Sequence, residues 1–167
     1  QGSPVRNPAL PAPGDHEATK PPLACRPPTR FTRSMCGRFT LTEPDGDLLA
    51  QDLGVSPGSL NGYEPRYNIA PTQEHFVLSI ENEDREALRA RWGLVNSWAK
   101  DAKRASNQIN ARSETVDKTP AYRSAFKKRR CLVPVDGFFE WDRSGKVRQP
   151  YWIHRPGRAL MFFAGLY

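Results

Sequence analysis

The sequence changes character at Met35. Eight of the 16 prolines lie before Arg33, in a stretch that contains almost no large apolar side chains. Such a stretch cannot bury enough apolar surface to offset the conformational entropy that it would lose on folding. From Met35 onward, short apolar runs are punctuated by Gly, Pro and Asn. We therefore expect a disordered, proline-rich leader over residues 1–34 and a folded domain over residues 35–167.

The chain as a whole is basic, with a formal net charge of +7 and a pI near 9.6. A surface of this charge concentrates polyanions at moderate salt, which suggests a nucleic acid as a partner. Many basic proteins carry only solvated basic faces, so charge alone leaves both interpretations open.

The three cysteines, Cys25, Cys36 and Cys131, are an odd number without C-x-x-C spacing. This argues against a disulfide framework and against a zinc site, so we expect a reducing compartment and no metal. No apolar run approaches the roughly 20 residues of a membrane-spanning helix, and the leader lacks the apolar middle of a secretory signal. Because the chain starts with Gln rather than Met, we expect a processed product or a partial reading frame.

The first part of the domain is predicted to contain a strand, a helix and a long loop. The strand ends over residues 39–41, and Thr42 can cap the following helix, which Gly54 stops. Three leucines share one face of that helix: Leu48, Leu49 and Leu53. The loop covers residues 61–74, with two prolines fixing its course.

The middle of the domain is predicted to form a hairpin followed by a helix. Residues 75–80 and 87–92 favour two strands joined by a charged turn. Ser113 can cap a helical stretch that Pro120 interrupts and that ends in the basic cluster 127–130.

The last part of the domain is predicted to be all strand and turn. Turn signals stand at Ser144-Gly145 and Pro156-Gly157. Four apolar runs favour strands: residues 132–135, 138–141, 151–154 and 160–164. The sum is an α+β domain that is rich in strands. The chain ends within an apolar run, at residues 165–167, which predicts a truncated domain.

Four short motifs stand out along the domain: Met35-Cys36-Gly37-Arg38-Phe39, Arg91-Trp92-Gly93-Leu94-Val95 with Trp98, Asn110-Ala111-Arg112-Ser113-Glu114-Thr115, and Pro134-Val135-Asp136-Gly137-Phe138-Phe139-Glu140-Trp141. Taken in this order, with Tyr-Asn-Ile-Ala-Pro-Thr at residues 67–72, they resemble the SRAP (SOS response-associated peptidase) family. The resemblance runs from about Met35 to Tyr167. It implies a mixed, barrel-like β core with short helices.

Cys36 suits a specific reaction if it becomes the first residue. After removal of Met35 it would carry a free α-amine beside its thiol. Such a 1,2-aminothiol can condense with an aldehyde to a Schiff base, which the thiol then closes to a thiazolidine ring. The ring-opened deoxyribose of an abasic site supplies such an aldehyde. Without the surrounding motif, an inert cysteine would be the simpler interpretation.

As the sequence stands, Cys36 is internal and its nitrogen is an amide, which cannot form a Schiff base. The intact chain could form at most a reversible thiohemiacetal. We therefore expect the functional product to begin at Cys36, through translation from Met35 or through removal of the leader.

The resemblance assigns two further catalytic residues, Asn110 and Glu140. Glu140 stands among aromatic residues, where the pKa of a carboxyl group is raised, so it could both give and take a proton. A strand glutamate that points to solvent is the plain alternative. The Asn110 amide could orient the amine or the sugar hydroxyls, or could help to cap a helix.

Four residues are candidates for DNA binding. Arg38 and Arg112 are carried over from the family as phosphate contacts, although ordinary surface ion pairing is an alternative. Trp92 and Trp98 flank a glycine-containing loop, and both could stack on unpaired bases. Core packing is slightly favoured for Trp92 and DNA contact for Trp98.

Two further features complete the comparison with the family. The basic run 127–130, together with Lys100, Lys103 and Arg104, could follow a DNA backbone or form a solvated helix face. The resemblance also implies a later histidine that assists the Schiff-base steps. None of the three histidines of this chain matches it: His16, His75 and His154.

The leading hypothesis is a DNA repair enzyme of the damage (SOS) response, which binds single-stranded DNA and cross-links covalently to abasic sites. It implies no cofactor, no membrane and a monomer, in the bacterial cytoplasm near the nucleoid or in a eukaryotic nucleus. One alternative is a thiol autopeptidase, a hydrolase that cleaves before Cys36. Another is a non-catalytic module that binds single-stranded DNA.

Overall fold

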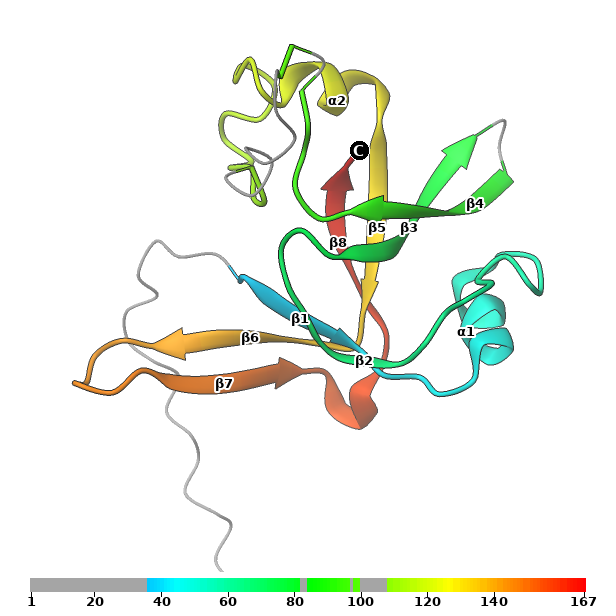
Figure 1. Ribbon diagram of the computed structural model, residues 1–167, viewed down its shortest axis with the longest axis horizontal. Helices are drawn as coiled ribbons and strands as arrows, with labels where there is room; N and C mark the ends of the chain where they lie inside the picture. Colours follow the sequence, from blue (N-terminus) through cyan, green and yellow to red (C-terminus); the bar gives the residue numbers. More distant parts are fainter. Residues whose placement is uncertain (1–35, 82–83, 97, 100–107) are drawn as a thin grey trace, which may run out of the picture. The chain divides into compact units, whose positions relative to one another are not determined.

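The computed structural model describes residues 36–81, 84–96, 98–99 and 108–167. All of them belong to one compact unit, Phe31–Tyr167. The predicted leader lies outside the described residues, so its disorder stays a prediction. Within the described part the chain forms eight strands, two α-helices and one short 3₁₀ helix (Figure 1).

The strands form two four-stranded sheets. The first sheet has the order β2-β1-β6-β7, with the bounds β1 Arg38–Leu41, β2 Arg66–Ile69, β6 Gly137–Asp142 and β7 Gln149–His154. The second has the order β4-β3-β5-β8, with the bounds β3 Glu74–Glu81, β4 Asp84–Arg91, β5 Arg130–Val135 and β8 Met161–Leu166. This confirms the prediction of a strand-rich domain with few helices.

Every strand pair recorded in the described residues is antiparallel. The expectation of a mixed sheet is therefore wrong. Two of the six pairs, β3–β4 and β6–β7, are hairpins, whose short connections allow only antiparallel pairing. Neither strand order closes on itself within the described part, so a barrel-like core stays a prediction.

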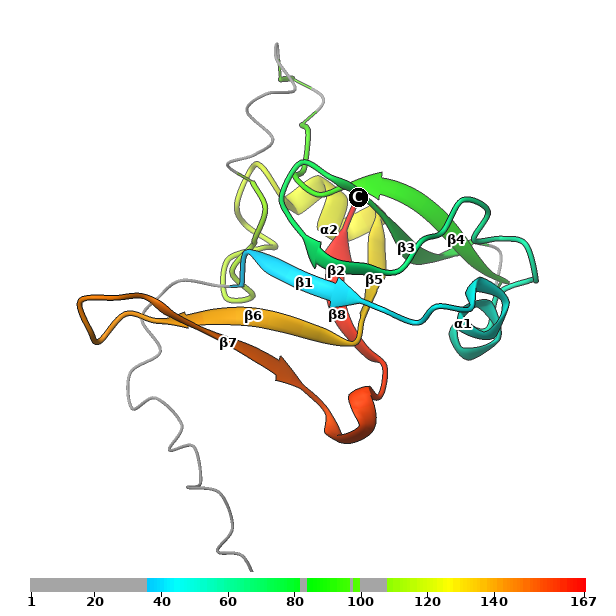
Figure 2. The same cartoon turned by 60° about the horizontal axis from the view of Figure 1, so that its bottom comes forward.

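A single residue, Asp136, separates β5 of the second sheet from β6 of the first, so one nearly continuous segment crosses from sheet to sheet (Figures 1 and 2). The core contains side chains from both sheets and from α1 (Gly46–Leu53). Its fully buried members include Leu41, Ile69 and Val135. The strand that carries Glu140 is thereby anchored in the interior.

Asp136 is a buried carboxylate that ties β1 to this crossing. Its Oδ1 accepts a hydrogen bond from Thr40 Oγ1 at 2.5 Å, and its Oδ2 accepts from the backbone N–H of Thr42 at 2.7 Å and from the Thr42 hydroxyl. Trp152 Nε1 donates to Thr40 Oγ1 at 3.2 Å. A β-carbon at Gly137 would overlap that indole, so only glycine fits there.

Helix α1 confirms one predicted boundary and corrects another. Gly54 ends the helix in the left-handed conformation at φ 67°, as expected. The N-cap is Asp45, whose carboxylate accepts from the N–H groups of Asp47 and Leu48, and not Thr42, which is bonded to Asp136 instead. Leu48 is 46% exposed, and the buried face carries Leu49, Ala50 and Leu53.

Two other expectations need correction. The predicted loop 61–74 contains β2, a short strand between two prolines that pairs with β1. Ser113 does not cap a helix: residues 113–118 form turns, and α2 (Arg123–Lys128) begins after Tyr122 without a side-chain cap. Proline at position 120 lacks the N–H that a continuous helix needs.

The remaining predictions agree with the structure to within a few residues. β3 and β4 pair along their whole length as the expected hairpin. The four late strands are confirmed as β5 to β8, although Arg130 of the basic cluster belongs to β5 and not to the helix. The second predicted turn is a 3₁₀ helix, Pro156–Arg158.

Candidate active site

Cys36 is half-buried and is separated from the start of β1 by one residue, Gly37. Arg38 of β1 pairs with Phe139 of β6 in antiparallel register. The chain that precedes Arg38 therefore continues alongside the β6 residues that follow Phe139, of which Glu140 is the first. Asn110 Nδ2 donates a hydrogen bond to the Cys36 carbonyl oxygen at 3.1 Å. The structure thus brings Cys36, Asn110 and Glu140 together from three distant parts of the sequence.

The thiol and the carboxyl group influence each other electrostatically. Burial raises the pKa of the Cys36 thiol above its ordinary value, and the negative charge of Glu140 raises it further, against the opposing effect of a backbone N–H. Burial also raises the pKa of Glu140, while the N–H of Trp141 and the charge of Arg143 act in the opposite direction. Both groups hold their protons more tightly than in water. A carboxyl group with a raised pKa is better suited than an ordinary glutamate to act as a general acid.

The backbone around Asn110 is held by two aromatic side chains. The Tyr122 hydroxyl donates to the Asn110 carbonyl at 3.2 Å, and Trp92 Nε1 donates to the Ile109 carbonyl at 2.9 Å. Burial raises the pKa of Tyr122, so its hydroxyl keeps the proton that it donates. These bonds fix the position from which the Asn110 amide reaches Cys36.

Of the two candidate tryptophans, Trp92 is half-buried and packs against the core, with its ring centroid 5.1 Å from that of Phe39. It therefore has the packing role that the sequence favoured for it, and DNA binding by Trp92 stays a prediction. Trp98 is 61% exposed, which leaves its ring available to a ligand.

The candidate phosphate contacts differ in their surroundings. Arg38 is half-buried and its Nη1 donates to Asn68 Oδ1 at 3.4 Å. Arg112 is exposed, as is the basic cluster 127–130. The other basic candidates, Lys100, Lys103 and Arg104, lie outside the described residues.

The two described histidines occupy different environments. His75 of β3 is buried, with Nε2 3.2 Å from the Pro134 carbonyl oxygen and its ring edge-on to Phe39. Burial lowers the pKa of His75 to about 4, and the charge of Arg66 acts in the same direction, against the hydrogen bond with Pro134. His154 is exposed and stacks on Trp152.

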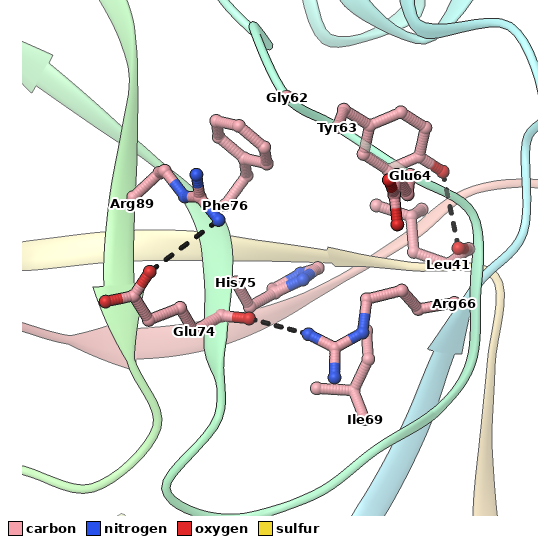
Figure 3. A pocket seen from close by; sticks show the side chains of 10 residues that line it. All are labelled: Leu41, Gly62, Tyr63, Glu64, Arg66, Ile69, Glu74, His75, Phe76 and Arg89. Atoms are coloured by element: carbon pink, nitrogen blue, oxygen red, sulfur yellow. Dashed lines mark hydrogen bonds and ion pairs between the residues drawn. The ribbon is translucent and has the colours of Figure 1, made fainter.

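A pocket of about 210 Å³ lies at the other end of β1 (Figure 3). Its lining residues are Leu41, Gly62, Tyr63, Glu64, Arg66, Ile69, Glu74, His75, Phe76 and Arg89. Arg66 donates to the Glu74 carbonyl at 2.8 Å, and Arg89 pairs with the Glu74 carboxylate at 3.6 Å. Leu41 lies five positions after Cys36 along an extended segment, a distance of roughly 16 Å. The pocket is therefore distinct from the Cys36 site.

The described residues contain no group of three or more His, Cys, Asp or Glu side chains that could hold a metal ion. Among them there is also no helix of the length and apolarity that crossing a membrane requires.

Sequence reasoning missed two residues around the site, Tyr122 and Tyr151, and gave no role to Asp136, which holds the far end of β1. Tyr151 of β7 stands directly opposite Glu140 of β6 and is 37% exposed. The sequence predicted both strands of the β6–β7 hairpin but not how they pair. The residue opposite Glu140 can be named only when the strand register is known, and the register depends on the length of the connecting loop.

A family model described as "SOS response associated peptidase (SRAP)" matches residues 35–167. The chain is 39% identical over 137 residues to the abasic site processing protein YoaM of Bacillus subtilis strain 168, covering 80% of this chain and 59% of that protein. It is 34% identical over 111 residues to the abasic site processing protein HMCES of Xenopus tropicalis, covering 59% of this chain and 33% of the relative. The chain therefore spans only part of the length of these relatives.

Solved structures show the same fold. A protein from Bacteroides thetaiotaomicron superposes with a TM-score of 0.62 at 21% identity, covering 78% of this chain and 59% of that one. A phage-related protein from Bordetella bronchiseptica gives a TM-score of 0.59 at 26% identity, with coverage of 78% and 60%.

Proposed function

The chain belongs to the SOS response associated peptidase (SRAP) family, and from this membership we propose that it processes abasic sites in DNA. The observation that carries the proposal is the convergence of Cys36, Asn110 and Glu140 at the start of β1. The names of the Bacillus and Xenopus relatives support the same substrate. The role belongs to DNA repair in the damage response.

The proposed chemistry is a condensation that loses one molecule of water. The α-amine of Cys36, once it is N-terminal, attacks the aldehyde carbon of the ring-opened sugar, and loss of water leaves a protonated Schiff base. The Cys36 sulfur then forms a bond to the same carbon as its proton passes to a base, which closes the thiazolidine ring. Glu140 is suited to donate a proton to the departing water and to accept the thiol proton. The product is a covalent DNA–protein cross-link.

The raised pKa of the Cys36 thiol bears on the choice between mechanisms. Little thiolate is present at neutral pH, and the thiolate is the nucleophile that peptide-bond cleavage needs. An iminium carbon is far more electrophilic than an amide carbon and can accept a thiol whose proton is removed during attack. This favours cross-linking over the alternative of a thiol autopeptidase that cleaves before Cys36.

The mechanism requires that the active form begin at Cys36. An amide nitrogen at this position has no lone pair available for Schiff-base formation. Removal of the residues before Cys36 would supply both the amine and access to it.

The DNA-binding residues of the proposal are those named from the family resemblance, and exposure supports Arg112 and Trp98 among them. Arg38 and Arg112 contact phosphates, and the exposed ring of Trp98 stacks on an unpaired base of a single strand. We expect a monomer with a barrel-like core, which acts in the bacterial cytoplasm or in the eukaryotic nucleus. A module that binds single-stranded DNA without catalysis would use the same surface.

The test is the formation of a heat-stable adduct. Protein that begins at Cys36 is incubated with a single-stranded oligonucleotide carrying one abasic site, and the adduct is resolved on a denaturing gel. We expect an adduct with the native residue and none with Cys36→Ser or with an acetylated amine. Equal adduct from the acetylated protein would contradict the thiazolidine mechanism.

A further inference from the structure

The hairpin of β6 and β7 is strongly basic beyond β6. The 16 residues 143–158 contain five Lys or Arg residues and no Asp or Glu: Arg143, Lys146, Arg148, Arg155 and Arg158. The first three lie in the loop that joins the two strands, and all three are exposed. A local excess of this size attracts a polyanion wherever the loop is accessible.

This loop lies at the same end of the first sheet as Cys36. β6 runs antiparallel to β1, so the end of β6 at Asp142 is the end at which β1 begins. Figures 1 and 2 both show the hairpin loop on the side of the sheet from which β1 starts. The positive charge of Arg143 acts on the Glu140 carboxyl, which places the start of the loop close to the site.

Two cations of the loop, Lys146 and Arg148, are not engaged in ion pairs within the part of the chain that the structure describes. Other arginines of the domain are engaged: Arg66 and Arg85 donate to backbone carbonyls, and Arg89 pairs with Glu74. The nearest acidic side chain in the sequence, Asp142, accepts a hydrogen bond from the Ser144 N–H and so orders the loop.

Tyr151 adds an aromatic surface beside the site. It is opposite Glu140 in the β6–β7 register, and directly opposed side chains project to the same face of a sheet. Its strand is at the edge of the sheet and the residue is 37% exposed. An abasic site leaves the neighbouring base without a stacking partner on one side. A tyrosine ring next to the reacting sugar can replace that partner.

We propose that the β6–β7 loop and Tyr151 form a second DNA contact, which binds the phosphates and the unpaired base of the nucleotides next to the abasic site. The contact rests on the proposed function, because it assumes that an abasic site is bound at Cys36 and that the DNA on one side of it extends along this hairpin. Lys146 and Arg148 bind phosphate oxygens, and the Tyr151 ring stacks on the base.

The phosphate part is tested by two double variants of the full chain that remove the same charge from opposite ends of β7. One is Lys146→Gln with Arg148→Gln, and the matched control is Arg155→Gln with Arg158→Gln. Affinity for an undamaged single-stranded oligonucleotide is measured against salt concentration. We expect the loop variant to reduce the slope of log K against log[salt] by about 1.4, since each single-strand phosphate contact contributes about 0.7. The control should change the slope much less, and equal effects would overturn the assignment to the loop.

The stacking part is tested by comparing Tyr151→Ala with Tyr151→Phe. The probe is an oligonucleotide with a tetrahydrofuran abasic analogue, which has no aldehyde and cannot cross-link. We expect about a tenfold loss of affinity for the alanine variant and near-native affinity for phenylalanine, because the ring supplies the stacking energy. Equal loss in both variants, or none in either, would overturn the stacking role.

Failure of this contact and failure of the proposed function give different results. Binding to undamaged strands and to the analogue involves no cross-link, so the difference between the native protein and a hairpin variant reports on the hairpin without the Cys36 chemistry. Adduct formation by the native protein tests the proposed function and does not require the hairpin contact. If the hairpin instead serves to bind a protein segment, the loop variant will bind DNA with native affinity and native salt dependence, and the proposed contact is wrong.

Discussion

Two carboxylates, Asp136 and Glu140, lie four residues apart in the sequence but differ in burial and in the number of hydrogen-bond donors around them. Asp136 is 6% exposed, and its oxygens accept hydrogen bonds from Thr40 Oγ1 and from the N–H and hydroxyl of Thr42. Glu140 is half-buried, and burial raises its pKa, with a backbone N–H and the charge of Arg143 as opposing influences. Asp136 is surrounded by hydrogen-bond donors, whereas Glu140 has few.

This difference separates structural from chemical use of the same functional group. Oxygens that already accept three hydrogen bonds hold β1 against the crossing of β5 into β6. An oxygen with few donors keeps its capacity to bind a proton or a ligand atom. Asp136 therefore has a structural role, because it holds β1 in place. Glu140 has the chemical role, because the start of β1 brings Cys36 close to its carboxyl group.

The largest effect is expected from removing the structural carboxylate. Asp136→Ala leaves the Thr42 N–H and hydroxyl without their acceptor in the interior, and leaves the Thr40 hydroxyl only the longer contact with the Gly137 carbonyl. It should lower the free energy of unfolding by about 3 to 5 kcal/mol. Urea denaturation followed by circular dichroism measures this. Asp142→Ala is the matched control, because that carboxylate is at the surface. Similar losses for both variants would remove the distinction drawn for Asp136.

The next largest effect is a loss of stability at low pH, which comes from the buried imidazole of His75. The pKa of His75 is about 4 in the folded chain, against 6.5 as its ordinary value, so the interior holds the neutral ring. Stability from this group is fully present above pH 6.5 and is lost as the pH falls toward 4, because only the unfolded chain then binds the proton. The loss is roughly 3 kcal/mol. Denaturation midpoints over this range should show it, and His75→Gln should show a flatter dependence.

Glu140→Gln tests the chemical side of the comparison. We expect adduct formation to slow by about 100-fold through loss of proton transfer, with the free energy of unfolding changed by less than about 1 kcal/mol. The same change should lower the pKa of the Cys36 thiol, since the charge of Glu140 helps to raise it. The pH dependence of alkylation by iodoacetamide reports that shift. A native adduct rate, or a loss of stability like that of Asp136→Ala, would contradict the assignment.

The smallest effect concerns a buried polar group without any partner. The Ser79 hydroxyl is buried and makes no hydrogen bond in the described structure. Ser79→Ala should therefore leave stability unchanged or raise it by up to about 1 kcal/mol. Thermal denaturation checks this, with Thr40→Ala as the contrast that removes a satisfied hydroxyl and should destabilise. Clear destabilisation by Ser79→Ala would show that its hydroxyl is bonded in solution.

Local signals in the sequence predicted the elements whose partners are near. The β3–β4 hairpin follows from two apolar runs with a charged turn between them, and the end of α1 follows from Gly54 alone. The late strands were found for the same reason.

Features with distant partners could not be found in this way. A threonine before a helix can cap it, and only the buried carboxylate of Asp136, 94 residues away, shows why Thr42 does not. Strand β2 has polar residues on its exposed positions and needs β1 beside it to be a strand at all.

The residues of the candidate site also fall into those that the sequence could predict and those that it could not. Cys36, Asn110 and Glu140 could be named because their motifs resemble those of a family, and the structure brings them together. Their catalytic roles stay a prediction. Tyr122 and Tyr151 could not be named from local patterns. Tyr122 contacts the site through a hydrogen bond to a residue 12 positions earlier, and Tyr151 lies beside it only because of the β6–β7 register.

The pairing of β1 with β6 joins strands that are separated by about 100 residues, the longest such closure among the strands described. Closures of this length are slow, because chain entropy is lost before any contact is gained. A chain still emerging from the ribosome has made Cys36 but not yet Glu140. Glu140 can therefore assist the chemistry proposed for Cys36 only after β1 and β6 have paired, so the full rate of that chemistry depends on completed folding.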